Sequence, residues 1–290
     1  MSIPCYPEFV PISFALQAEL QGRLFPIPDG VSEYTFANLY LFRKRYKYRI
    51  ALHENSLIIS GEREGTRFFM SPCEVPEHAV ILELFKTHKY WKGISESVLI
   101  PNQERLLQWG IEIAEDRDNF DYLYRRTDLA QLPGKKYHKK RNLVNAFLGA
   151  YRHEEWPLTA ELLPQAMMVL ERWRQDKGED GDYYAAREAL ELFTPLGMQG
   201  SIYYINGTPA GWCLGEALAT GRIFAIHFEK GIDAYKGIYQ FMNQTFAASL
   251  SEECTYINRE QDLGDTGLRQ AKMTYRPWGF VRKYTGHYKG

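Results

Sequence analysis

The residues best suited to chemistry lie close together near the C-terminus, in the stretch 256–275. A short β-type run over 254–257 leads into a loop of polar and charged side chains, which are Asn258, Arg259, Glu260, Gln261 and Asp262. Charges placed between the end of a strand and the start of a helix indicate a site, because α/β folds place their chemistry in such loops. We expect these side chains to form an ion-pair network that shapes a pocket. The alternative is a solvated loop with ordinary ion pairs.

A predicted helix over 267–275 follows this loop and carries two cations on one face. Arg269 and Lys272 are three residues apart and could together hold a phosphate or a carboxylate. They could equally pair with Glu260 and Asp262.

A second candidate pair lies on the strand predicted over 222–228 and just beyond its end. His227 and Glu229 are two residues apart, so an extended strand would place both on one face. Either could take the proton of an attacking amine or bind a cationic amine. The structural alternative is that Glu229 pairs with Lys230 or Arg259.

The most basic segment is 134–142, in which five of the seven residues from Lys135 to Arg141 are cationic. Basic residues interleaved with an aromatic residue are typical of sites that hold phosphate or a nucleic-acid backbone. Lys136, Lys139 and Arg141 are therefore candidate contacts to a phosphate-bearing substrate. The alternative is a solvated helix face.

Composition excludes several classes of function. The chain has 290 residues, 45% of them hydrophobic, and a net charge of -1, which gives no electrostatic case for binding duplex DNA. The four cysteines are far apart and read as reduced thiols of a cytoplasmic protein. The sequence shows no secretory signal, no apolar run of the roughly 20 residues that span a membrane, and no spacing of ligands typical of a metal site.

Hydrophobic periodicity places these candidates on elements. The predicted strands are 46–52, 56–60, 67–70, 98–100, 119–124, 201–205, 210–218, 222–228, 254–257 and 280–284. The predicted helices are 14–24, 76–87, 103–110, 158–175, 183–194, 236–250 and 267–275. Both halves combine a meander of strands with later helices and strands. We therefore predict an α+β protein with one architecture used twice, in domains 1–150 and 151–290, each a mixed sheet flanked by helices.

The second half resembles the Gcn5-related N-acetyltransferase (GNAT) fold. The segment 275–280, Tyr-Arg-Pro-Trp-Gly-Phe, is similar to that family's Tyr-x-x-x-Gly-Phe. The resemblance implies that Tyr275 closes a helix and protonates the leaving group. It also implies that the loop 233–238 holds the pyrophosphate of an acyl-coenzyme A, through Tyr235, Lys236, Gly237 and Ile238. Of the usual loop pattern only Gly237 fits well, since Ala234 and Tyr239 occupy the outer positions.

A closer resemblance covers most of the chain. The segment 134–142, His227-x-Glu229-Lys230, Asn258 to Gly264 and the run 267–272 are together similar to the C-terminal domain of phosphatidylglycerol lysyltransferases, and more narrowly to its stand-alone branch. This implies two tandem GNAT-like domains and transfer of an acyl or aminoacyl group. The donor would be acyl-coenzyme A or aminoacyl-tRNA, bound in the groove between the domains, with no tightly bound cofactor.

Three hypotheses follow. The first is an acyl- or aminoacyl-transferase that acts on an amine or hydroxyl acceptor, with Glu229, His227 and Tyr275 as catalytic residues and the 258–272 and 136–141 groups binding substrate. The second is a non-catalytic ligand-binding module on the same scaffold, which the unusual 234–239 loop favours. The third is RNA binding alone through the basic segment, against which the neutral net charge argues.

Overall fold

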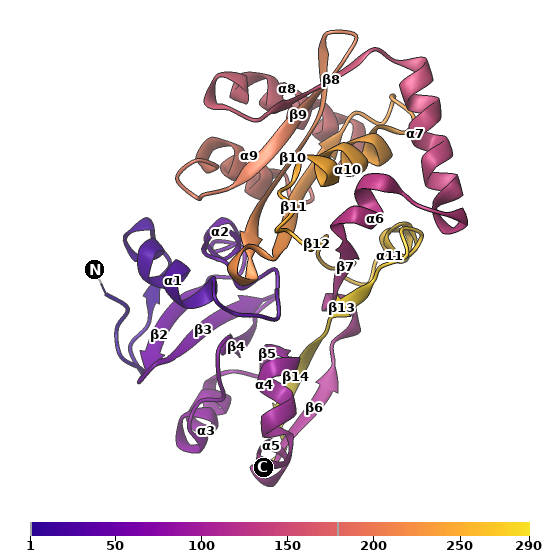
Figure 1. The fold of residues 1–290 in the computed structure, drawn as a ribbon. Helices are drawn as coiled ribbons and strands as arrows, with labels where there is room; N and C mark the ends of the chain where they lie inside the picture. The colour runs from indigo at the N-terminus through magenta and orange to yellow at the C-terminus, as the bar shows by residue number, and fades with distance from the viewer. Residues whose placement is uncertain (1, 179) are drawn as a thin grey trace.

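The computed structural model describes residues 2–178 and 180–290 and contains two mixed β-sheets of seven strands each (Figure 1). In spatial order, sheet A consists of β1 (Val10–Pro11), β2 (Arg49–His53), β3 (Ser56–Arg63), β4 (Thr66–Met70), β5 (Tyr90–Ser95), β14 (Lys283–Tyr288) and β6 (Ile111–Glu115). Sheet B consists of β13 (Gly279–Val281), β7 (Asp121–Arg125), β12 (Tyr256–Asn258), β11 (Ile223–Gly231), β10 (Thr208–Leu218), β9 (Gln199–Ile205) and β8 (His153–Pro157). Within this part of the chain only β4–β5 and β11–β12 are parallel neighbours.

The two halves of the chain exchange strands. Strand β7, from the first half, lies in sheet B between β13 and β12, and the C-terminal strand β14 lies in sheet A between β5 and β6. The single strand predicted over 280–284 is therefore wrong, because its residues belong to two strands in different sheets. The boundary at residue 150 stays a prediction, and strands cross it in both directions.

The exchanged strands are joined by a buried ion pair. Lys283 Nζ on β14 lies 2.7 Å from Asp121 Oδ1 on β7, and the two side chains are 1% and 0% exposed. Asp121 also accepts hydrogen bonds from the backbone N–H and the hydroxyl of Ser32, and Lys283 pairs with Glu33 as well. Buried charges need such partners because desolvation alone would expel them. This network fixes how sheet A meets sheet B.

The sheets are covered by helices on both faces. The helices are α1 (Gln17–Leu24), α2 (Phe36–Leu41), α3 (His78–Thr87), α4 (Glu96–Leu99), α5 (Gln103–Gln108), α6 (Arg126–Gln131), α7 (His138–Ala150), α8 (Leu163–Lys177), α9 (Tyr183–Leu192), α10 (Ile238–Ser249) and α11 (Thr266–Met273). Figure 1 shows α8 and α9 on one side of sheet B and α6, α7 and α10 on the other.

Alternation along the strands of sheet B supplies two separate cores. Leu214 on β10 packs in the core that α1, α2, α8 and α9 share with sheet A, whereas its neighbour Cys213 packs with α6, α7 and α10. Sheet B is thus buried on both faces, which explains why most of β10 and the first half of β11 carry apolar residues on both faces.

Several local predictions differ from the structure. The strand predicted over 98–100 is wrong, because residues 96–99 form α4 with Val98 and Leu99 buried. Its short apolar run has no alternation to distinguish a strand from one helical turn. Strands β1, β5, β6 and β8 and helices α2 and α6 were not predicted, since each is short and packs mainly through tertiary contacts. No helix within 2–178 or 180–290 is both long and apolar enough to cross a membrane.

Candidate functional site

The candidate site lies where the parallel strands β11 and β12 separate. They pair only over Ile223–Ala225 and Tyr256–Asn258, after which β11 continues to Gly231 while the other chain segment turns away. Asn258 starts the turn, because its Oδ1 accepts the backbone N–H of Glu260 at 2.7 Å, and Glu260 adopts a φ of 54° in the left-handed region. The opened strand ends leave room for the side chains that follow.

Strand β11 carries a bulge at His227. Leu214 of β10 pairs with Phe228 and the next residue, Gly215, pairs with Ile226, so His227 has no cross-strand partner. A bulge reverses the alternation of side chains beyond it. Glu229, opposite Cys213, therefore points to the α10 side, whereas His227 contacts Glu216 on the side facing α2. The expectation that His227 and Glu229 share one face is wrong for this reason.

On the α10 side, cations outnumber carboxylates. Arg259 forms an ion pair with Glu229, and its guanidinium carbon lies 5.3 Å from the centre of the Tyr275 ring. When the Asn243 amide is turned to place its oxygen toward Arg259, that oxygen accepts hydrogen bonds at 2.9 and 3.2 Å. Lys140 of α7 lies over the same tyrosine, with its Nζ 4.0 Å from the Tyr275 ring centre. We call Glu229, Arg259, Tyr275 and Lys140 the α10-side cluster.

The α10-side cluster shifts the pKa of two of its members. Burial raises the pKa of Tyr275 to about 12, so its phenol stays protonated at neutral pH. Burial, followed by repulsion from Arg259, lowers the pKa of Lys140 to about 8. Tyr275 thus keeps its phenol proton and lies beside two cations, Arg259 and Lys140.

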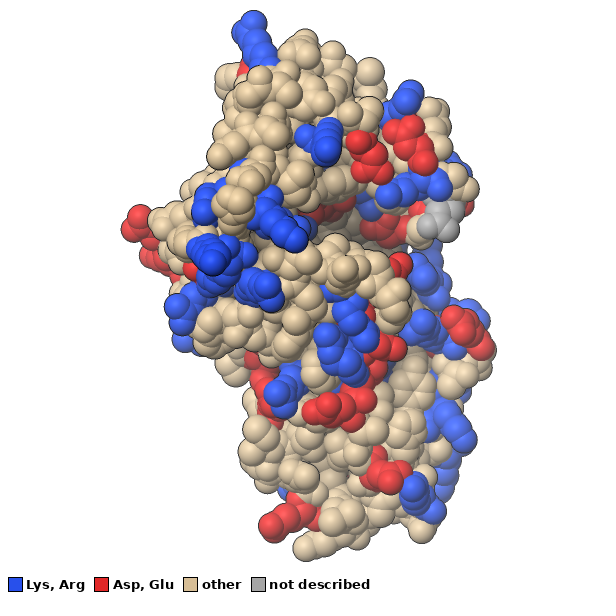
Figure 2. All heavy atoms as spheres, turned by 90° about the vertical axis from the view of Figure 1, so that its right-hand side faces the viewer, with Lys and Arg blue, Asp and Glu red and all other residues tan. Residues whose placement is uncertain are grey.

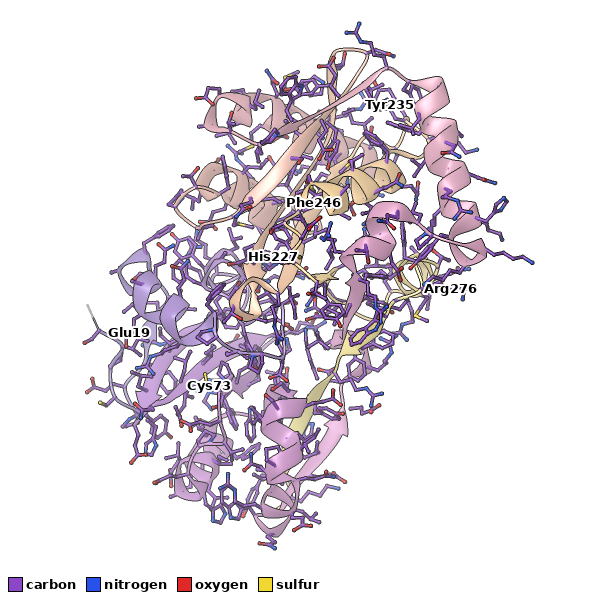
Figure 3. All side chains as sticks on the ribbon, viewed as in Figure 1. Glu19, Cys73, His227, Tyr235, Phe246 and Arg276 are labelled. Carbon is purple, nitrogen blue, oxygen red and sulfur yellow. The ribbon has the colours of Figure 1, made fainter. Side chains whose placement is uncertain are left out.

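On the opposite side of β11, one imidazole bridges two carboxylates. His227 Nδ1 lies 2.7 Å from Glu260 and its Nε2 lies 3.0 Å from Glu216 of β10, with the imidazole side chain only 1% exposed. Burial alone would lower the pKa of His227, but hydrogen bonds and charge from both carboxylates raise it to about 10. Both ring nitrogens of the imidazolium donate, so His227 has no lone pair for an incoming proton. Figure 3 shows His227 near the centre of the molecule, where β11 meets the N-terminal half.

The remaining charged groups of the 258–272 motif hold the loop itself. The Asp262 carboxylate is fully buried and accepts from Tyr122 at 2.6 Å, from Arg269 at 2.7 and 2.9 Å and from the backbone of Gly264 at 2.9 Å. Arg269 also pairs with Asp118 at 2.7 Å. These donors hold the pKa of Asp262 far below its usual range even though burial opposes them. The sequence alternative in which Arg269 pairs with Asp262 is confirmed.

Lys272 and Asn258 also form hydrogen bonds within the protein that hold the loop in place. The Lys272 ammonium donates to the carbonyls of Arg259 at 2.6 Å, Glu260 at 3.1 Å and Gln261, which engages all three of its protons. Asn258 is fully buried and donates to Gly30 at 2.8 Å and Asp121 at 3.0 Å. Direct substrate contacts by Asn258, Arg269 and Lys272 stay predictions, and the geometry shows them positioning Arg259 and Glu260.

Helix α7 covers the loop expected to hold a pyrophosphate. A Cβ atom added to Gly237 would lie 2.9 Å from the Leu143 carbonyl oxygen and 3.2 Å from the Phe147 Cβ. Ile238 is 1% exposed, and Tyr235 packs edge-on against Tyr151 at 5.5 Å, as its position beside the end of α7 in Figure 3 shows. Lys236 is exposed. Binding of a cofactor by Tyr235, Lys236, Gly237 and Ile238 stays a prediction.

The basic segment passes through one 3-10 turn, Lys135–Tyr137, into the start of α7. Lys135, Lys136 and Lys139 are exposed on it, whereas Tyr137 is buried. Lys136 pairs with Asp128 at 3.1 Å, and Arg141 donates to the carbonyl of Gly134 at 2.6 Å and to that of Leu132. Lys139 is exposed and makes no hydrogen bond or ion pair with the described part of the chain. Figure 2 views the molecule from this side and shows Lys and Arg side chains gathered on it. Lys139 is the candidate of the three that is free to contact a substrate.

Sequence reasoning missed three residues of the site. Glu216 interrupts the apolar run of β10, and a lone carboxylate inside such a run is a signal that a buried partner exists. Lys140 lay within the basic run and could not be separated from its exposed neighbours. Asn243 sits among the apolar residues of α10 and is 2% exposed, which is again a buried polar group in need of a partner. No group of three or more His, Cys, Asp or Glu within 2–178 and 180–290 is arranged to hold a metal ion.

Comparisons with known proteins agree with this architecture. Residues 25–286 match the family described as phosphatidylglycerol lysyltransferase, C-terminal. A crystal structure of a conserved protein of unknown function from Bacteroides thetaiotaomicron is similar with a TM-score of 0.88 and 28% identity, covering 97% of this chain and 99% of that one. The C-terminal domain of a protein assigned as a lysylphosphatidylglycerol synthetase from Agrobacterium fabrum is similar in fold, with a TM-score of 0.66 and 14% identity over 96% of this chain and 93% of that one.

A curated relative matches part of the chain. An uncharacterized protein of Mycoplasmoides gallisepticum is 23% identical over 185 residues, which is 61% of this chain. The match spans 58% of that relative's length.

Proposed function

Because the chain belongs to the phosphatidylglycerol lysyltransferase C-terminal family, we propose that it is an aminoacyltransferase whose donor is an aminoacyl-tRNA. Its fold is the tandem GNAT-like fold of that family. The acceptor is an amine or a hydroxyl, and the reaction takes place beside the α10-side cluster.

The contact between α7 and the start of α10 is the observation that favours aminoacyl-tRNA over acyl-coenzyme A as the donor. In the resembling acetyltransferases the pyrophosphate of coenzyme A binds at a helix start equivalent to Gly237, where backbone amides attract an anion. Here the Leu143 carbonyl and the Phe147 side chain lie against that glycine. The same helix presents the exposed Lys139 on the outer surface, and Lys135 is exposed in the turn that leads into it. These two features support a phosphate-bearing donor that lies along α7 over one that enters at α10.

The α10-side cluster supports transfer from an ester. The acceptor attacks the aminoacyl carbonyl, a new bond to that carbon forms, and the ester bond to the ribose oxygen breaks. Tyr275 donates its proton to the leaving oxygen, and Glu229 takes the proton of the acceptor. Arg259 and Lys140 stabilise the negative charge that develops on the carbonyl oxygen, because a water-poor site strengthens such interactions.

The test is transfer of a radiolabelled aminoacyl group. Purified protein is incubated with a mixture of labelled aminoacyl-tRNAs, and loss of label from tRNA and its appearance in a new product are followed. We expect Tyr275→Phe to slow transfer by about 100-fold or more, because it removes a general acid. The matched control is Tyr184→Phe, at an exposed tyrosine on α9. Transfer from acetyl-coenzyme A but from no aminoacyl-tRNA would contradict the proposal.

The donor surface is tested by salt dependence. Lys135→Ala with Lys139→Ala is expected to weaken binding of charged tRNA and to flatten the plot of log affinity against log salt by about 0.7 for each phosphate that the variant no longer neutralises. The control double variant is Lys44→Ala with Lys89→Ala, which removes two exposed cations outside α7. Arg141 is left unchanged because it holds the carbonyls of Leu132 and Gly134.

One observation favours the second candidate, a non-catalytic binding module. Glu229, Asp262 and Lys272 are already engaged by partners within the protein. Under that function, charged tRNA binds with the same salt dependence but no label is transferred, and Tyr275→Phe leaves every measured property unchanged.

A further inference from the structure

A cavity of about 430 Å³ lies on the α2 side of β11, away from the α10-side cluster. It lies between α1, the start of α2, the approach to β9 and the end of β10. Its walls are mainly apolar and include Leu24, Phe36 and Leu218. Among the described residues that line it, Glu216 alone carries a formal charge.

Only one oxygen of the Glu216 carboxylate has a hydrogen-bond partner within the described chain. The side chain is 10% exposed, and one oxygen lies 3.0 Å from His227 Nε2. Within the described chain no other hydrogen bond to this carboxylate occurs. Glu216 lines the cavity, and its second oxygen accepts no hydrogen bond from the described chain. A nine-tenths-buried carboxylate with one free oxygen needs a further donor.

The charges around His227 do not cancel. Two carboxylates, Glu216 and Glu260, face one imidazolium, which leaves one negative charge. Asn38 of α2, which approaches Glu260 at 3.5 Å, is neutral. Arg259, the neighbour of Glu260 in the chain, pairs with Glu229 on the other face of β11, and Lys272 donates to the backbone carbonyl of Glu260. Among the described residues no Lys or Arg nitrogen lies within 4.0 Å of either carboxylate. The cavity wall at Glu216 therefore favours a positively charged ligand.

We propose that this cavity binds an organic primary ammonium on an apolar stem, with the ammonium donating to the free oxygen of Glu216 and the stem lying against Leu24, Phe36 and Leu218. The ammonium supplies both a compensating positive charge and a hydrogen-bond donor. The apolar walls favour an alkyl stem over a hydrated metal cation, because Glu216 is the only carboxylate among the described residues that line the cavity. This binding needs no transfer chemistry, so amine binding and aminoacyl transfer can fail separately.

The experiment is calorimetric titration of the full chain with n-pentylammonium chloride. Saturable binding is expected for pentylammonium, with at least tenfold weaker or no binding of pentan-1-ol, sodium pentanoate and potassium chloride at equal ionic strength. Glu216→Gln is expected to weaken pentylammonium binding by about tenfold or more, since a charge-assisted hydrogen bond becomes a neutral one. Glu19→Gln is the matched control, because it removes the same charge from α1 without touching the cavity lining.

A second variant keeps the proposal testable if Glu216→Gln does not fold. Gly22 of α1 lines the cavity, and a Cβ there meets nothing within 4 Å, so Gly22→Leu narrows the space without backbone strain. We expect Gly22→Leu to abolish pentylammonium binding and Gly149→Leu, the same change at an open helical glycine of α7, to leave it intact. The proposal is overturned if wild-type protein binds no pentylammonium, if pentan-1-ol or potassium binds equally well, or if both cavity variants bind like wild type.

Discussion

The two faces of sheet B beside β11 carry opposite charge. On the α10 side, Arg259 and Lys140 face one carboxylate, Glu229, whereas on the α2 side two carboxylates face His227 alone. One inserted residue separates the two arrangements, because the bulge at His227 turns it and Glu229 to opposite faces. Strand β11 thereby has a cationic cluster on its α10 side and an anionic cluster on its α2 side.

This separation suits a substrate with both signs of charge. An aminoacyl-tRNA carries anionic phosphates and a cationic amine, and one undivided cluster could not favour both. The loop that reaches both faces is the same: Arg259 turns to the α10 side and Glu260 to the α2 side. Asp262, Arg269 and Lys272 hold that loop in place, so the polarity of the two faces depends on its backbone.

The largest expected effect comes from breaking the pair on the α10 side. Glu229→Ala leaves the Arg259 guanidinium, 14% exposed, without its carboxylate. Loss of one partner of a buried pair lowers the free energy of unfolding by about 3–5 kcal/mol. Urea unfolding measures this. Glu229→Leu combined with Arg259→Met removes both charges, so it should lower the free energy of unfolding less than Glu229→Ala does. An equal decrease in the two variants would show that the unpaired Arg259 charge does not cause the loss of stability.

The α2 side should differ in its dependence on pH. The pKa of His227 in the folded protein is about 10, above its unfolded value of about 6.5, so its contribution to stability is complete below pH 6.5 and is lost as pH rises through 10. Relative to His227→Gln, the wild-type protein should lose about 2.5 kcal/mol of unfolding free energy between pH 7 and pH 9. Parallel stability curves for the two proteins would mean that His227 is not held as an imidazolium.

The smallest effect is expected at Lys140. Its pKa of about 8 means that it is charged at pH 7 and largely neutral at pH 9. Lys140→Ala should weaken binding of charged tRNA about fivefold at pH 7, which corresponds to one partly screened charge. The affinity of the wild-type protein should fall between pH 7 and pH 9, and that of Lys140→Arg should stay constant. A fall of the same size in Lys140→Arg would assign the titration to another group.

Much of the architecture could be predicted from local pattern. The hairpin of β9 and β10 follows from alternating residues around Asn206-Gly207, and α10 from the spacing of Ile238, Phe241, Met242 and Phe246. The pairing of Arg269 with Asp262 was one of two stated alternatives. The residues of a long periodic helix or strand specify its structure, so such an element can be predicted without knowing which elements pack against it.

The bulge and the strand exchange could not be predicted in this way. Alternation places His227 and Glu229 on one face unless an extra residue is inserted, and insertion is visible only against the partner strand β10. Lys283 and Asp121 are far apart in sequence and become partners only because β14 and β7 change sheets. Pairing across such a distance leaves no local signal.

The sequence by itself indicated one part of the candidate site: the polar run 258–262, the two cations on α11, Tyr275, and the pair on β11. It did not indicate Glu216, Lys140 or Asn243. The residues that it did indicate stand at consecutive positions or at helical spacing in the sequence, so they can be recognised from the local pattern. The tertiary structure decided which of them meet. It set Arg259 against Glu229 and Glu260 against His227, placed Lys140 over Tyr275, and laid α7 on Gly237, because each of these contacts joins elements brought together by packing rather than by spacing along the chain.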